Sequence, residues 1–405
     1  MVGKYGPTDA GIRERRGYDM RAGILSINIY TGRLNYGAVL HSWYFQKLML
    51  RRDDIESCEI VDYTPWERGN YNPWTHFLPK QPLRNPQKFA RYLAITPGYV
   101  KRWRAFQAFF QKHLIISAAK YTGETLREAA LPYDALFFES DVIWSPRYFG
   151  GAFNPVYFGA LPSMRSIRKI VYSASMSDAH LTPEDHAALD GLLRYPDAIS
   201  MRERYASEIV RSHTDKPVQD VLDPVLLADP GDFDEITAPR LVRQKYVLTY
   251  FPIRPNRYVT QCARTYAEAR GFRLVEVSLY PESRLHCKTF VSAGIEAFVS
   301  LVRNAEAVFC NSLHGACLAL LFHKEFYAFE REGGGLKYKD LCARFGLENR
   351  FVPMNGYRED APVDWENVDR LRARYRRESL AWLDRAIRAE AIPTDIINER
   401  RNEHE

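Results

Sequence analysis

Several signatures of common protein classes are missing from this chain of 405 residues. Its six cysteines form no CxxC pair, which excludes a zinc ribbon and a disulfide-rich secreted scaffold and indicates a reducing compartment. The first residues lack the apolar run of about 7–15 residues that a signal peptide needs. The most apolar stretch, residues 316–322, is far shorter than the roughly 18 residues of a spanning helix. We therefore expect a cytoplasmic protein without a transmembrane segment.

Motifs with a fixed catalytic spacing are missing as well. No Walker or G-x-G-x-x-G pattern marks a nucleotide site, and there is no H-E-x-x-H or G-x-S-x-G motif. Asp53 and Asp54 follow a predicted helix, which is a poor context for a metal. We expect neither a metal nor an organic cofactor.

Charge is nearly balanced, because the chain has 56 Lys and Arg residues and 50 Asp and Glu residues, which gives a net charge of +6. Duplex binding usually needs concentrated basic stripes, so nucleic acid is not expected as a partner. Aromatic residues are abundant, at 13% of the chain. They suit carbohydrate rings as well as protein cores, and core packing is the commoner use.

Short apolar strands alternate with amphipathic helices along the chain, which favours parallel sheets covered by helices. Residues 1–20 are expected to form a flexible leader. The alternation fills two segments, 21–228 and 240–352, with an acidic linker between them. Residues 65–97 are expected to form a long loop. The fold class is therefore α/β, with two Rossmann-like doubly wound domains facing a cleft.

A helical tail is expected over residues 363–392, as one helix or two. Its apolar residues recur at i, i+3 and i+7, so one stripe packs and the arginine-rich remainder is solvated. This basic helix and exposed aromatic residues point to contact with the inner face of a membrane, and a solvated helix face is the alternative account of the charges.

Ligands of doubly wound sheets bind beyond the C-terminal ends of the strands, so residues in those loops are the first candidates. His314 follows a predicted strand and opens a helix, where an imidazole suits acid–base chemistry near neutral pH. A capping or core histidine is the alternative. Arg202 also follows a strand and suits a phosphate or carboxylate, or else it pairs with Glu203. Further candidates for the same anion are Asn311, Ser312, Gly315, Arg254 and Arg257.

Two other loops carry polar and aromatic groups that suit a hydroxyl-rich ligand. The first loop holds Asn28, Asn35, Tyr36 and Gly37, although Asn-Tyr-Gly is also ordinary turn chemistry. The second holds Ser140, Asp141 and Trp144, where a carboxylate beside an aromatic face can hold a sugar or cap a helix.

Taken in order, these motifs resemble those of the polysaccharide pyruvyl transferases. The blocks that carry the resemblance span residues 22–352 and are Asn35-Tyr-Gly-Ala-Val-Leu40, Ser140-Asp-Val-Ile-Trp144, Lys169-Ile-Val-Tyr-Ser-Ala-Ser175, Ile199-Ser-Met-Arg-Glu203, Val221-Leu-Asp-Pro224, Asn311-Ser-Leu-His-Gly315 and Gly346-Leu-Glu-Asn-Arg350. The chain departs from the family pattern where Glu139 replaces a usual glycine, His41 a common glutamine, and Ser312 an arginine.

The resemblance implies a fold like that of GT-B glycosyltransferases and transfer of pyruvate from phosphoenolpyruvate onto a sugar as a ketal. It implies that His314 is the general acid or base and that Arg202 binds the donor. Ser312 stands where family members carry a second donor-binding arginine, so Arg254 or Arg257 would have to supply that cation here. The N-terminal domain would bind the saccharide acceptor, a lipid-linked one included, and the C-terminal domain the donor. There are two alternatives. One is a GT-B glycosyltransferase that uses a nucleotide sugar, with residues 330–335 as a weak candidate for its pocket. The other is a non-catalytic glycan-binding relative.

Overall fold

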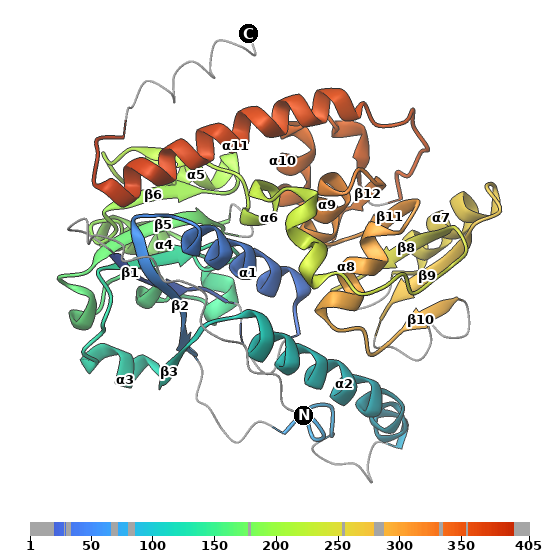
Figure 1. The fold of residues 1–405 in the computed structure, drawn as a ribbon, viewed down its shortest axis with the longest axis horizontal. Coiled ribbons are helices and arrows are strands. Elements are labelled where there is room, and N and C mark those ends of the chain that lie inside the picture. The colour runs from blue at the N-terminus through green and yellow to red at the C-terminus, as the bar shows by residue number, and fades with distance from the viewer. Residues whose placement is uncertain are drawn as a thin grey trace, which may run out of the picture.

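Two parallel β-sheets organise the chain (Figure 1). The structure is a computed structural model and describes residues 20–27, 29, 34–65, 72–79, 86–176, 180–252, 256–278, 287–331, 335–353 and 355–392. Each sheet is built mainly from short runs of buried apolar residues, such as Ala135–Glu139, which is buried on both faces. Parallel strands covered on both sides by helices have this composition.

The first sheet has seven described strands in the order β3-β2-β1-β4-β5-β6-β7. They are β1 (Met20–Leu25), β2 (Ile55–Tyr63), β3 (Ile116–Tyr121), β4 (Ala135–Glu139), β5 (Arg168–Ala174), β6 (Ala198–Met201) and β7 (Val218–Asp220). The connecting helices are α1 (Tyr36–Leu50), α2 (Pro86–His113), α3 (Gly123–Glu128), α4 (Pro183–Leu192) and α5 (Arg204–Arg211), and three 3₁₀ turns, η1 to η3, lie between Pro146 and Met164.

The second sheet has six described strands in the order β10-β9-β8-β11-β12-β13. They are β8 (Tyr246–Tyr250), β9 (Arg273–Val277), β10 (Lys288–Phe290), β11 (Ala307–Cys310), β12 (Glu325–Phe329) and β13 (Phe351–Val352). The helices are α7 (Arg257–Glu268), α8 (Ile295–Arg303), α9 (Leu313–Leu321) and α10 (Leu336–Arg344), with the short turn η6 (Glu348–Arg350). Both sheets share the 3-2-1-4-5-6 order of the doubly wound fold, which confirms the predicted fold class.

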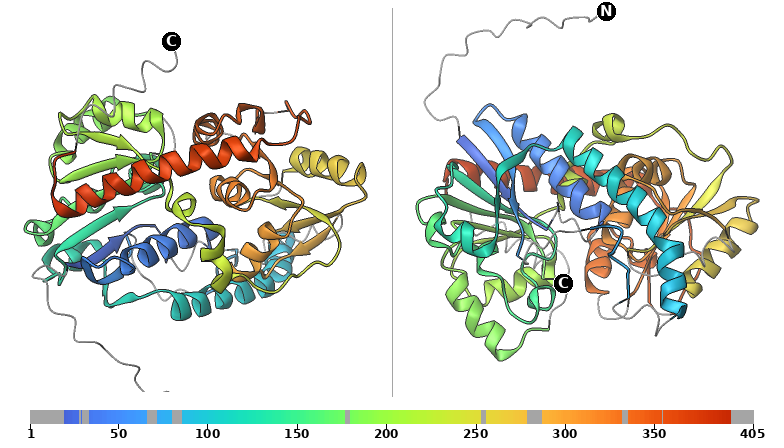
Figure 2. Two further views of the ribbon diagram at one scale, coloured as in Figure 1. Left: turned by 45° about the horizontal axis from the view of Figure 1, so that its top comes forward. Right: turned by 90° about the horizontal axis from the view of Figure 1, so that it is seen from below.

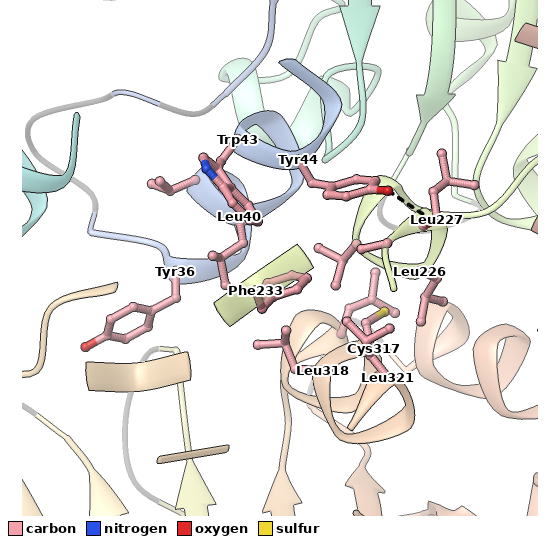
Figure 3. Packing of buried hydrophobic residues seen from close by; sticks show 14 of the residues in the cluster. Tyr36, Leu40, Trp43, Tyr44, Leu226, Leu227, Phe233, Cys317, Leu318 and Leu321 are labelled. Carbon is pink, nitrogen blue, oxygen red and sulfur yellow. Dashed lines mark hydrogen bonds between the residues drawn. The ribbon is translucent and has the colours of Figure 1, made fainter. Parts of the chain in front are cut away.

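The segment between the sheets is not a loose linker. It forms α6 (Pro224–Leu227) and the 3₁₀ helix η4 (Pro230–Ile236), whose apolar side chains are buried. Figure 3 shows Phe233 between Leu40 of α1 and Leu318 of α9, and the hydroxyl of Tyr44 donates to the carbonyl of Leu227 at 3.2 Å. An apolar interface therefore fixes α1 of the first domain against α9 of the second.

The tail is one helix, α11 (Trp365–Arg388), which crosses both domains (Figures 1 and 2). Its predicted apolar stripe packs inward, with Val368, Leu383 and Ile387 buried. The expectation that the arginine-rich remainder is solvated is wrong in part. Arg372 and Arg376 donate to backbone carbonyls of residues 226–228, because the end of α6 leaves those carbonyls without helical partners.

The predicted long loop over residues 65–97 is also wrong in part. Helix α2 begins at Pro86 and continues through Pro97 to His113. Proline is accommodated well at the first position of a helix, and the later turns are held by buried side chains such as Phe106 and Phe109. Arg102 of α2 donates to the carbonyls of Phe290 and Val291, so α2 also joins the two domains.

Candidate functional site

The candidate site lies where the C-terminal ends of both sheets face each other. Arg202 and Asp223 follow β6 and β7 of the first sheet, and His314 follows β11 of the second. Ligands of doubly wound folds bind at this edge. Distant sequence motifs meet here, since the His314 imidazole is bonded to the Asp223 carboxylate, 91 residues earlier in the chain.

Asp223 is the centre of the cluster. Its Oδ2 lies 3.2 Å from Nε2 of His314 and accepts from Nη1 of Arg202 at 3.0 Å and from Oγ of Ser140 at 3.2 Å. Its Oδ1 accepts from the backbone N–H of Val225 at 3.0 Å and so caps α6. One buried carboxylate therefore joins groups from both domains.

The charges of the cluster stabilise one another. Burial opposes ionisation of Asp223, but His314 and Arg202 outweigh it and hold the pKa of this carboxyl well below its usual range. Burial likewise opposes the charge of Arg202, and the carboxylates of Glu203 and Asp223 outweigh it and raise the pKa of the guanidinium. Asp223 is an anion and Arg202 a cation at any working pH.

The absence of a side chain at Gly37 leaves space for the imidazole of His314. A Cβ atom on Gly37 would lie 2.0 Å from Nδ1 of His314, so only glycine fits the imidazole here. Asn35 caps α1 by accepting from the backbone N–H groups of Gly37 and Ala38. The Asn-Tyr-Gly motif thus starts α1 and leaves room for a side chain of the other domain.

A small cavity of about 20 Å³ adjoins Asp223 between the domains, which is room for roughly one water. Its charged lining consists of three cations and three acids, with an apolar wall of leucines and a cysteine; the charged residues are Arg202, Glu203, Asp223, Lys337, Asp340 and Arg344. Arg202 is held by the carboxylates of Glu203 and Asp223, and Arg344 by two backbone carbonyls.

Lys337 of α10 supplies a cation that titrates near neutral pH. Burial, and then the nearby Arg202, lower the pKa of its ammonium to about 8. Arg344, at the C-terminal end of α10, donates to the carbonyls of Val221 and Arg202. These two residues, and not a residue of the Asn311–Gly315 loop, provide the further cations beside Arg202.

The loop after β11 leads into α9, and two of its predicted donor-binding residues have structural contacts there. Ser312 caps α9 by accepting from the N–H of Gly315, and a Cβ on Gly315 would press on Cys310 at 3.0 Å. The Oδ1 atom of Asn311 is buried and has no hydrogen-bond partner among the residues that the structure describes. Asn311 therefore stays a candidate for ligand contact.

Trp144 and Tyr36 do not offer a face to a sugar in this structure. The Trp144 ring is fully buried, stacks on Phe158 at 4.4 Å and donates its N–H to the carbonyl of Tyr157. Tyr36 stacks on Phe298 at 4.2 Å and donates its hydroxyl to the carbonyl of Ala293. Both rings satisfy their polar atoms inside the protein, so this structure corrects the expectation of aromatic sugar contacts.

The remaining candidates lie apart from the cluster or outside the description. Arg257 is the exposed first residue of α7. Arg254 and Asn28 lie outside the described residues, as does part of the 330–335 segment. Ser140 and Asp141 belong to the cluster and have positive φ angles of 48° and 52°. Two consecutive left-handed residues without glycine mark a strained turn, and such strain concentrates at functional sites.

The sequence did not single out four residues in or beside the cluster: Asp223, His41, Glu139 and Lys337. In the sequence, Asp223 belongs to the block Val221-Leu-Asp-Pro224 of the family resemblance, and an aspartate shortly after a strand is itself a signal. His41 and Glu139 stood out only as departures from family motifs. Lys337 carries no local signal, because its role depends on where α10 lies.

Metal sites and membrane spans are absent from the part of the chain that the structure describes. No three His, Cys, Asp or Glu side chains there are arranged as metal ligands. None of its helices combines the length and the apolar character needed to cross a bilayer.

Two doubly wound domains with a charged site between them define a protein of GT-B-like architecture. The family model for polysaccharide pyruvyl transferase matches residues 35–333, well over half of the chain. The chain therefore belongs to the polysaccharide pyruvyl transferase family, and it is a transferase. No curated protein matches it significantly in sequence.

Solved structures with a similar fold are remote. They include the UDP-GlcNAc 2-epimerase from Neisseria meningitidis, at 9% identity and a TM-score of 0.45 over 90% of this chain and 93% of that chain. The glycosyltransferase SnogD from Streptomyces nogalater has 11% identity and a TM-score of 0.38, over 92% and 98% of the two chains. The E. coli ADP-heptose heptosyltransferase II has 11% identity and a TM-score of 0.33, over 88% and 99%. These similarities do not bear on the reaction.

Proposed function

We propose that the protein transfers the enolpyruvyl group of phosphoenolpyruvate to two hydroxyls of a saccharide, forms a pyruvate ketal and releases phosphate. The observation that carries the proposal, beyond membership of the family, is the His314–Asp223–Arg202 cluster between the domains. It combines a proton-transfer group with cations, as a reaction on a triply charged donor requires.

His314 acts as the general acid in this proposal. Asp223 engages Nε2 and so orients the ring. Nδ1 lies against Gly37 and is the ring nitrogen that Asp223 leaves free, so in this proposal it protonates the methylene carbon of the donor once donor binding has widened the site. The resulting cationic carbon is attacked by one hydroxyl, and a second hydroxyl displaces phosphate.

The donor anions are bound by cations and backbone N–H groups in this proposal. Arg202, Lys337 and Arg344 line the cavity, and the N-terminus of α9 begins at Ser312. Helix N-termini favour anions, and guanidinium groups match phosphate and carboxylate geometry. The cavity is smaller than phosphoenolpyruvate, so donor binding must widen it by a movement of the domains or side chains.

The acceptor in this proposal is a glycan carried on a lipid, and the enzyme works at the inner face of a membrane. The surface that supports this is α2 and the segment before it. Helix α2 has no Asp or Glu over residues 86–113. Leu93 of α2 and Trp74 are large apolar side chains that are 56% and 48% exposed. Sedimentation with anionic and neutral lipid vesicles tests this, and equal failure to bind either kind would remove the membrane contact.

Incubation of the full chain with phosphoenolpyruvate and a panel of galactosides and N-acetylmannosamine derivatives tests the reaction itself. Phosphate release that needs both substrates, with a ketal methyl signal in the NMR spectrum of the product, is the expected result. Consumption of a nucleotide sugar would support the glycosyltransferase instead. Glycan binding that phosphoenolpyruvate does not affect would support a non-catalytic relative.

A further inference from the structure

His41 and Glu139 form a buried ion pair next to the cluster. Nδ1 of His41 lies 2.8 and 3.0 Å from the two carboxylate oxygens of Glu139, and both side chains are fully buried. The hydroxyl of Ser42 donates to Oε2 of Glu139 at 2.7 Å. Burying two charged groups costs desolvation free energy that an apolar pair of similar size avoids. Core packing alone therefore does not account for this pair.

The second nitrogen of His41 is the unusual feature. Nε2 is buried and has no hydrogen-bond partner among the described residues. It lies 4.0 Å from Oδ2 of Asp141, in the strained turn after β4. The ring stacks on His314 with centroids 5.4 Å apart. An unpaired buried nitrogen thus points toward a carboxylate of the candidate site.

Three carboxylates set the protonation of His41. Burial favours the neutral ring, but Glu139 and Asp141 from the end of β4 and Asp223 before α6 outweigh it and raise the pKa of His41. The other titratable ring packed against it is His314 of α9. The charged form directs one N–H to Glu139 and the other toward Asp141.

We propose that Asp141 is the base for the saccharide hydroxyl and that His41, held by Glu139, is a positioning residue that orients Asp141. This rests on the proposed function. Asp141 is suited to contact a substrate because its side chain is 11% exposed, whereas that of His41 is fully buried. His41 acts on the reaction through Asp141.

The protons of the reaction then balance. As the first hydroxyl oxygen bonds to the donor carbon, its O–H bond breaks and the proton passes to Asp141, while His314 gives a proton to the methylene carbon. The second hydroxyl bonds to the same carbon, loses its proton, and the C–O bond to phosphate breaks. Of the two hydroxyl protons, one replaces the proton lost by His314 and the other leaves with phosphate.

Three variants of the full chain test the proposal: His41→Gln, Glu139→Gln and, as a matched control, His323→Gln. His323 follows the C-terminal end of α9, opposite the end that carries His314, and forms an exposed pair with Asp369, so its loss leaves turnover unchanged. His41→Gln should lower kcat at least about tenfold, as expected for an impaired base, with little change in KM for phosphoenolpyruvate. Glu139→Gln removes a carboxylate that raises the His41 pKa, so the fall of kcat at alkaline pH should begin at a lower pH.

A side-chain ¹H–¹⁵N NMR titration of the histidines, compared with His41→Gln, measures the protonation of His41 without any activity. A kcat and a pH profile unchanged in both site variants would overturn the role of His41. If His41→Gln fails to fold, the pH profile of kcat for the isosteric Glu139→Gln variant tests the role of His41 instead. Absence of phosphate release by the wild-type chain would instead contradict the proposed function, so the two failures are distinguishable.

Discussion

The imidazole of His314 lies against the backbone of Gly37, so that a methyl group there would be 2.0 Å from Nδ1. These residues belong to different domains, and the apolar interface of α1, α6 and α9 brings them together (Figure 3). Helix α1 of the first domain thus forms one wall of the site around His314 of the second domain.

Gly37→Ala should therefore abolish activity by displacing His314. The overpacking should also cost about 1–3 kcal/mol of unfolding free energy, as buried insertions usually do. Gly123→Ala is the matched control, because no atom lies within 4 Å of a Cβ built there. Thermal denaturation and phosphate release measure both effects. An active, equally stable Gly37→Ala variant would show that the contact does not shape the site.

His314→Ala should lower kcat by about 10²–10⁴-fold, the usual contribution of a general acid. The fold should persist, since the ring is replaced by a smaller side chain at a helix N-terminus. Circular dichroism checks the fold and phosphate release checks the rate. Retention of kcat within a factor of a few would remove His314 from proton transfer.

Asp223→Asn should destabilise the protein by about 3–5 kcal/mol near neutral pH, because it leaves Arg202 and His314 without their shared buried carboxylate. The pKa of Asp223 is depressed in the fold, so its stabilisation is present above the unfolded value of 3.8. It is lost progressively as the pH falls below that value. The stability difference between wild type and variant, from chemical denaturation, should shrink there. A difference that is constant down to pH 3 would contradict this.

Lys337 should make donor affinity fall as the pH rises through about 8, where burial places the pKa of its ammonium. Lys337→Met should show a raised KM for phosphoenolpyruvate below that pH, and Lys337→Arg should keep KM low above it. Lys339→Met, on the exposed side of α10, is the control. KM profiles in which wild type and Lys337→Met rise together would remove this residue from donor binding.

Trp144→Phe should reduce stability and leave the acceptor KM unchanged. The variant loses the hydrogen bond to the carbonyl of Tyr157 and part of the stacking on Phe158, both inside the core. Thermal denaturation and acceptor saturation curves separate the two effects. A raised acceptor KM with unaltered stability would return Trp144 to the binding site.

The sequence was sufficient to predict the architecture because each strand and helix has its own local pattern. Parallel strands such as β4 are continuous apolar runs, and α9 starts at a polar cap that is visible in the sequence. Helix α2 was missed in part because its first turns are exposed and contain Pro97, so that no apolar period marks them.

The site was less predictable because it depends on contacts between distant segments. His314 and Arg202 were found from their positions after strands, but Asp223, which joins them, was not. Two of the three departures from the family motifs, His41 and Glu139, form one ion pair, which only the fold brings together. The expectation of sugar contacts for the aromatic residues failed because local sequence does not show that Trp144 is enclosed in the core.

The central claim is that phosphoenolpyruvate gives its pyruvyl group to a saccharide at the His314–Asp223 site. The most direct test is to follow phosphate release and ketal formation together, with wild type and His314→Ala, on phosphoenolpyruvate and the saccharide panel. We predict equimolar phosphate and ketal with wild type only when both substrates are present, and neither product at a comparable rate with His314→Ala. Equal rates in the two proteins, or consumption of a nucleotide sugar in place of phosphoenolpyruvate, would contradict the account.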